Sequence, residues 1–114
     1  MPAEVRRGDI YWIDWNPGRG SEQRGLRPAL VIQNDIGNTY SSTTIVAALT
    51  TAVEKPYPFL VRVSAKESRI PKDSTVNLAV ILTVDKARLG NKCGALSEAK
   101  MAEVDKAIKA SLGL

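Results

Sequence analysis

Short apolar runs separated by turn residues make up most of the chain before residue 96. Aromatic and β-branched residues are frequent in the strand-length runs DIYWIDW (9–15), ALVIQ (29–33), TTIVAAL (43–49) and PFLVRVS (58–64). STVNLAVILTV (74–84) is a longer apolar stretch, typical of a strand buried on both faces for much of its length. The Asn, Asp, Gly and Ser content of the segment NDIGNTYSS, after the second run, predicts a loop. The pattern as a whole predicts β-structure.

The C-terminal segment changes to a helical period. Its apolar residues recur at steps of three and four positions, which places them on one stripe of a helix: Met101, Val104, Ile108 and Leu112. Ser97 suits the N-cap of this helix. Opposite charges at helical spacing, Glu103 with Lys106 and Asp105 with Lys109, are expected on its outer side. These elements predict a mainly β fold, a strongly curved sheet or half-open barrel of about five to seven strands with a C-terminal helix.

Composition is consistent with one globular domain over residues 1–114. Hydrophobic residues make up 44% of the chain and charged residues 25%, and no shift in composition suggests a linker. The N-terminus lacks the apolar region of a secretory signal, and no apolar run is long enough to span a bilayer. Cys93 is the only cysteine, so no intrachain disulfide can form. We therefore expect a reducing compartment, the cytoplasm.

The absence of histidine narrows the chemistry of any active site. Without histidine the chain cannot build a Ser–His–Asp triad or a Cys–His pair, and with one cysteine it has no ligand set for structural zinc. An enzyme made from this chain must use arginine, lysine, carboxylates, hydroxyls and backbone amides. The formal net charge of +4 mildly favours an anionic partner.

The loop before the second apolar run carries more chemistry than a turn requires. Residues 16–27 contain Arg19, Arg24 and Arg27 against one acid, Glu22. A solvated hairpin loop explains such charges equally well. The position of Arg27, between this loop and Pro28 at the mouth of a strand, favours a fixed guanidinium that contacts phosphate oxygens.

Thr50 lies at the far end of the next apolar strand. Its hydroxyl comes close to Arg27 if the two strands pair antiparallel with their ends level. The alternative is a threonine selected only for its β propensity.

At this level of detail the sequence resembles a known family. RGDIYWIDWNPGRGSEQRGLRPALVIQNDIGN is similar to the N-terminal signature of the MazF/PemK toxins of bacterial toxin–antitoxin pairs, and YSSTTIVAALTT is similar to the segment that follows it. The similarity continues through KPYPFLVRVS, TVDKARLG and MAEVDKAIKASLGL. It therefore covers nearly the whole chain from Arg6 onward.

The resemblance implies a fold, an activity and partners. The implied fold is a small SH3-like β-barrel, related to the CcdB toxins, that works as a homodimer. The implied activity is that of an mRNA interferase, an endoribonuclease that cuts single-stranded RNA without metal or cofactor and leaves 2′,3′-cyclic phosphate and 5′-hydroxyl ends. The implied inhibitor is a MazE-like antitoxin whose disordered C-terminal segment blocks the RNA groove.

The resemblance also assigns roles to residues. The catalytic arginine and threonine of the family match Arg27 and Thr50. We hypothesise that Arg27 stabilises charge on the phosphoryl oxygens, that Thr50 fixes a phosphate oxygen or relays a proton, and that Glu22 is a candidate general base. Four further residues of the loop are expected to bind RNA: Ser21, Gln23, Arg24 and Arg19.

One stretch departs from the family pattern. Where the family carries polar residues before TVDKARL, this chain has Ala79, Val80 and Leu82. If those positions face RNA, the chain has fewer hydrogen-bonding groups there; if they do not, the strand packs more deeply, at a dimer interface for example. This departure leaves open a weakened module that only binds RNA or antitoxin.

A DNA gyrase poison of the same fold is the other alternative. Gyrase poisons of this fold act through a C-terminal helix that ends in aromatic residues, whereas this chain ends in KASLGL. Trp12 and Trp15 lie instead in the first predicted strand, where we expect them to pack in the core.

Overall fold

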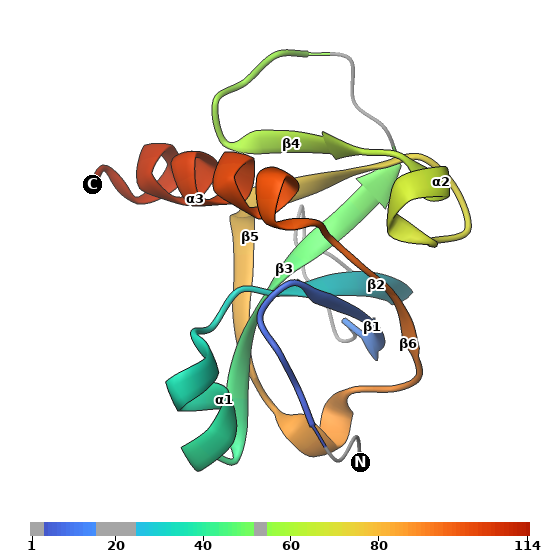
Figure 1. The fold of residues 1–114 in the computed structure, drawn as a ribbon, viewed down its shortest axis with the longest axis vertical. Coiled ribbons are helices and arrows are strands. Elements are labelled where there is room, and N and C mark those ends of the chain that lie inside the picture. The colour runs from blue at the N-terminus through green and yellow to red at the C-terminus, as the bar shows by residue number, and fades with distance from the viewer. Residues whose placement is uncertain (1–3, 16–24, 52–54) are drawn as a thin grey trace.

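Six strands form one antiparallel sheet in the computed structural model, which describes residues 4–15, 25–51 and 55–114. In chain order the elements are β1 (Asp9–Asp14), β2 (Leu26–Val31), α1 (Asp35–Tyr40), β3 (Thr43–Thr51), β4 (Leu60–Val63), α2 (Ala65–Ser68), β5 (Ser74–Asp85), the 3-10 turn η1 (Lys86–Arg88), β6 (Lys92–Ala95) and α3 (Glu98–Leu112). The strand order in the sheet is β4-β5-β3-β2-β1-β6. Figure 1 shows the sheet strongly curled, with α3 lying along β4 and α1 at the opposite end of β3. The predicted mainly β fold with a C-terminal helix is confirmed.

The curled sheet buries side chains on both of its faces. Alternate residues of each strand point to opposite faces, so one strand contributes to two cores. The first core lies between the sheet and α3, and its members include Ile10, Leu30, Leu49, Val76, Leu78, Met101 and Val104. The second core lies on the other face, and its members include Val5, Tyr11, Ile13, Trp15, Ala29, Val46, Ala48 and Leu89. The central strands are therefore rigid, and their ends carry the residues of functional interest.

Segment 34–42 contains a helix where the sequence predicts a loop. The side chain of Asn34 accepts a hydrogen bond from the backbone N–H of Gly37, at 2.8 Å, and caps the first turn of α1. The Asn and Asp residues that favour turns are also good N-cap and first-turn residues, and this short helix spans only 35–40. The loop prediction for residues 35–40 is therefore wrong.

The C-terminal helix forms as predicted, and the charged residues expected on its outer side are exposed: Glu103, Asp105, Lys106 and Lys109. Ser97 caps α3 by accepting from the backbone N–H of Lys100, at 3.2 Å. Glu103 pairs with Lys100, at 3.1 Å, and Asp105 pairs with Arg7, at 2.6 Å. The contact with Arg7 ties the helix to the N-terminal segment, which helical spacing alone cannot reveal.

Strand β5 is buried on both faces only in its first half. Ala47 pairs with Ile81 and Ala48 with Asn77, so residues 78–80 lie outside the ladder with β3. From Ala79 to Thr83 the side chains are half-buried or exposed. The backbone groups of Leu78 find other partners: its N–H donates to the carbonyl of Phe59 and its carbonyl accepts from Ser111. The expectation of burial on both faces for much of the strand therefore holds only for its first half.

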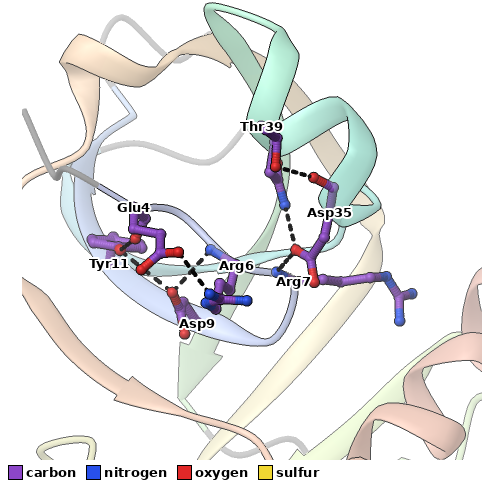
Figure 2. Close-up of polar contacts among 8 residues, drawn as sticks. Glu4, Arg6, Arg7, Asp9, Tyr11, Asp35 and Thr39 are labelled. Carbon is purple, nitrogen blue, oxygen red and sulfur yellow. Dashed lines mark hydrogen bonds and ion pairs between the residues drawn. The ribbon is translucent and has the colours of Figure 1, made fainter.

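A polar network fixes the start of β1 (Figure 2). The buried Asp9 carboxylate accepts from the backbone N–H of Arg6, at 3.1 Å, and from the Tyr11 hydroxyl, at 3.4 Å. Its other oxygen lies 3.1 Å from the ammonium of Lys92 in β6. Nearby, the backbone N–H of Arg7 donates to Asp35, and this contact lowers the pKa of the Asp35 carboxyl.

Tyr11 makes the fold sensitive to alkaline pH. Burial, with the charge and hydrogen bond of Asp9, raises the pKa of Tyr11 from 10.0 to about 12. The unfolded chain therefore releases this proton at a lower pH than the folded chain. The stabilising contribution is complete below pH 10 and is lost as the pH rises to about 12.

We expect the free energy of unfolding to fall less steeply between pH 10 and 12 in Tyr11→Phe than in the wild type. Urea titrations at a series of alkaline pH values measure this slope. Tyr40→Phe is the matched control because Tyr40 is exposed. Equal slopes in the wild type and Tyr11→Phe would contradict the assignment.

Within the described residues, no helix is long and apolar enough to cross a membrane.

Candidate functional site

Arg27 and Thr50 lie near each other, at the ends of neighbouring strands. β2 pairs antiparallel with β3 from Val31 to Ala29, with Ala29 opposite Ala48, so Arg27 and Thr50 each lie two residues beyond the last pair. Ala29 and Ala48 both belong to the second core, and strand alternation places Arg27 and Thr50 on that same face. The prediction was that these two residues come close together if the strands pair antiparallel with their ends level. The antiparallel pairing is confirmed.

Both residues lie at strand ends where solvent has access. Arg27 is exposed and Thr50 is half-buried. The Thr50 hydroxyl lies 3.3 Å from the carbonyl of Thr51, a contact within its own strand. On the other side of β3, Thr50 faces the fully buried Thr75 of β5. The guanidinium and the hydroxyl therefore extend from the ends of well-packed strands.

Pro28 ends the pairing of β2 with β3 beside these residues. The pairing runs from Val31 to Ala29 and stops before Pro28, which has no backbone N–H to donate. On its other side, Pro28 stays in register with Trp12 of β1. The ends of β2 and β3 are thus released from each other at the position where Arg27 and Thr50 lie.

A pocket of about 170 Å³ opens at these strand ends. Arg27 and Thr50 border it, together with residues from β1, β3 and the segment after α2: Trp12, Leu26, Pro28, Leu49, Thr51, Pro71, Lys72 and Ser74. Most of these strand residues project from the face opposite to the Arg27 and Thr50 side chains, by the alternation that assigns Leu49 to the first core. The side chains of Arg27 and Thr50 and the pocket are therefore on opposite faces of the sheet, at the same strand ends.

The two tryptophans have different surroundings. Trp15 is 7% exposed and belongs to the second core, as predicted. Trp12 is half-buried, belongs to neither core and lines the pocket, so the expectation that it packs in the core is wrong. Alternation along β1 gave no signal for this, because Trp12 is in phase with Ile10, which is buried in the first core. Lys72 was also not predicted as a site residue, because no local pattern in the sequence points to it.

The loop candidates lie outside the described residues: Arg19, Ser21, Glu22, Gln23 and Arg24. The flanks of that segment are described. The backbone N–H of Trp15 donates to the carbonyl of Gly25, at 2.9 Å, so the loop leaves and rejoins the sheet at one place. Arg27 is two residues beyond that hydrogen bond. The roles of these five residues stay predictions.

The apolar departure from the family pattern lies on the side of the sheet that carries Arg27 and Thr50. Val80 and Leu82 are half-buried and pack against the second core, while Ala79 is exposed. These residues are therefore not more deeply packed than a surface strand. Across residues 4–15, 25–51 and 55–114, no three His, Cys, Asp or Glu side chains gather in a way that could hold a metal ion.

Comparison with known proteins identifies the family. Residues 6–112 match the model of the PemK-like, MazF-like toxin of type II toxin–antitoxin systems. The chain belongs to this family. It is 50% identical over 111 residues to the Endoribonuclease MazF of Staphylococcus epidermidis, an alignment that covers 96% of this chain and 92% of that protein. The resemblance read from the sequence is confirmed, and with it the enzyme class of the family, an endoribonuclease toxin.

Solved structures carry the same fold. An endoribonuclease from a mycobacterial species, in complex with its cognate antitoxin, matches with a TM-score of 0.80 at 26% identity and covers 96% of both chains. MazF from Deinococcus radiodurans matches with a TM-score of 0.81 at 23% identity, covering 99% of this chain and 100% of that one. This second likeness establishes the fold alone.

Proposed function

We propose that this MazF-family chain cleaves single-stranded RNA without a metal ion, and leaves a 2′,3′-cyclic phosphate and a 5′-hydroxyl. The observation that supports the proposal is that Arg27 and Thr50 lie close together at the ends of β2 and β3, on one face of the sheet. A guanidinium offers a planar fork of donors to phosphate oxygens, and a hydroxyl beside it offers one more. The family relationship supports RNA as the substrate.

The reaction needs no nucleophile from the protein. The 2′-hydroxyl of the RNA attacks the adjacent phosphorus, a proton leaves that hydroxyl, and the bond to the 5′-oxygen breaks as that oxygen is protonated. Arg27 stabilises the negative charge that builds on the non-bridging oxygens. Thr50 holds one of these oxygens or relays a proton, and Glu22 is the candidate base for the 2′-proton. Ser21, Gln23, Arg24 and Arg19 bind the RNA from the loop.

We further propose that the active form is a homodimer. Large apolar side chains are exposed on α1, where Ile36 is 75% and Tyr40 86% exposed, and the half-buried residues Val80 to Leu82 lie in β5, on the far side of β3 from β2. Apolar area of this kind favours burial against a second copy. We also propose an antitoxin as the inhibitor, because a relative of the same fold is solved with its cognate antitoxin. The expected compartment is the cytoplasm.

Cleavage in excess EDTA tests the proposed reaction. We expect the purified protein to cut an unstructured RNA at full rate in EDTA, since the mechanism uses no metal ion. Analysis of the product ends should find 5′-hydroxyl and 2′,3′-cyclic phosphate groups. Loss of cleavage in EDTA, or 5′-phosphate ends, would contradict the mechanism. RNA binding without cleavage would favour the weakened binding module, and inhibition of gyrase without RNA cleavage would favour the gyrase poison.

A further inference from the structure

We propose that the pocket beside Arg27 and Thr50 is a subsite for one unstacked nucleobase of the RNA, with Trp12 as its stacking surface and Lys72 as the contact for the adjoining phosphate. The inference rests on the proposed function, because it takes single-stranded RNA as the substrate. It adds two residues, from segments distant in the sequence, to those that the family pattern assigns.

Trp12 offers an aromatic side chain on a closely held backbone. Its backbone N–H donates to the carbonyl of Asn91, at 3.0 Å, and its carbonyl accepts from the N–H of Gly90, at 2.7 Å. A Cβ atom at Gly90 would lie only 2.9 Å from the Trp12 carbonyl oxygen, so the chain approaches here as closely as glycine permits. The indole itself is half-buried and lines the pocket. Aromatic side chains on a nucleic-acid-binding surface stack on single-stranded bases with little regard to sequence.

Lys72 supplies a cation at the rim of the same pocket. It is exposed, and within the described part of the chain it forms no ion pair. The carboxylate of its neighbour Asp73 is engaged elsewhere, because it accepts from the backbone N–H of Ala65, at 2.8 Å. The Ser74 hydroxyl donates to the Lys72 carbonyl, at 3.0 Å, and holds the turn. A fixed turn with an unneutralised ammonium is suited to a phosphate.

The size and walls of the pocket fit a base. Its volume of about 170 Å³ is below the roughly 300–1,000 Å³ of pockets for drug-sized ligands, so it takes one small group. Leu49 and Pro28 give it apolar walls, while Thr51 and Lys72 give it polar groups. The side chains of Arg27 and Thr50 project from the other face of the sheet, at the same strand ends. An RNA strand whose scissile phosphate contacts Arg27 therefore crosses the ends of β2 and β3 and presents a neighbouring base to Trp12.

The stacking role is tested with an uncleavable RNA that carries a 2′-deoxy group at the scissile residue. We expect Trp12→Ala to weaken binding about tenfold and Trp12→Tyr, which keeps a ring, to stay within about threefold of the wild type. A series of RNAs with one abasic position each should contain one position whose abasic form weakens binding to the wild type about tenfold and does not weaken binding to Trp12→Ala. Tyr57→Ala, outside the pocket, is the aromatic control.

The phosphate role is tested through salt. Each phosphate contact to single-stranded nucleic acid contributes about 0.7 to the slope of log affinity against log salt concentration. We expect Lys72→Gln to lower the slope by about that amount and Lys72→Arg to restore it. Lys106→Gln, on the exposed side of α3, is the matched control and should leave the slope unchanged. Because Lys72 is on the surface, this test stands even if Trp12→Ala does not fold.

The outcomes separate the subsite from the proposed reaction. Normal cleavage of ordinary RNA by the wild type, with additive abasic effects at every position and an unchanged salt slope in Lys72→Gln, would overturn the subsite alone. Failure of the wild type to bind the uncleavable RNA would overturn both. Variants that lose antitoxin binding but keep RNA affinity would also overturn the subsite, and would assign the pocket to the antitoxin.

Discussion

We expect Arg27→Ala to lower the rate of RNA cleavage by about 10²–10³-fold, mostly in kcat. The proposed reaction builds negative charge on phosphoryl oxygens, and loss of one preorganised donor to such charge costs about that factor. Arg27 is exposed and outside both cores, so truncation should leave the fold intact. A fluorogenic RNA substrate measures the rate, and circular dichroism verifies the fold.

Two variants sharpen the result for Arg27. Arg62→Ala removes another exposed arginine, on β4, and should keep activity within about twofold, since surface substitutions away from functional features have small effects. Arg27→Lys keeps the charge but loses the planar fork of donors, so it should recover only part of the rate. Equal activity in the wild type and Arg27→Ala would rule out a role for Arg27 in the chemistry.

Leu30→Ala is expected to destabilise the fold by about 2–5 kcal/mol, the range observed for buried leucines. Leu30 is 0% exposed and lies in β2 at the centre of the first core. Truncation leaves a cavity between the sheet and α3 that the rigid neighbouring strands cannot close. Such a loss is a large part of the about 5–15 kcal/mol that stabilises a typical domain. Urea unfolding followed by tryptophan fluorescence measures it.

The matched control for Leu30→Ala lies in the same strand. Leu26 is 68% exposed, so Leu26→Ala should change the free energy of unfolding by no more than about 0.5 kcal/mol. Similar losses in the two variants would mean that the burial of β2 differs from the arrangement described above.

Local signals in the sequence were strong wherever one periodic pattern dominated. The strand runs and the helical stripe of Met101 and Val104 correspond to β1 to β5 and α3, because alternation and the helical period reflect burial directly. Arg27 was recognisable as a candidate site residue from its place before Pro28, at the start of a strand, and from the family signature. Antiparallel pairing of the two strands, with level ends, was the predicted condition for bringing Thr50 close to Arg27.

Where two local tendencies compete, the local sequence was a poor guide. Residues 35–40 carry turn formers that also cap helices, and α1 forms because Asn34 satisfies the N–H of Gly37. The apolar run in β5 was expected to be buried, but residues 78–80 leave the ladder and the following side chains reach the surface. A run of apolar residues does not reveal whether the partner strand stays in register.

By itself, the sequence determined the mainly β class, the C-terminal helix, the family and the identity of Arg27 and Thr50 as the pair to examine. Only the tertiary structure decided that these two residues lie at neighbouring strand ends, that Arg7 pairs with Asp105, and that Trp12 and Lys72 share a pocket. The physical reason is the range of the interactions. Periodicity and capping act within a few residues, whereas register, sheet curl and the closing of a pocket depend on contacts between segments far apart in the chain.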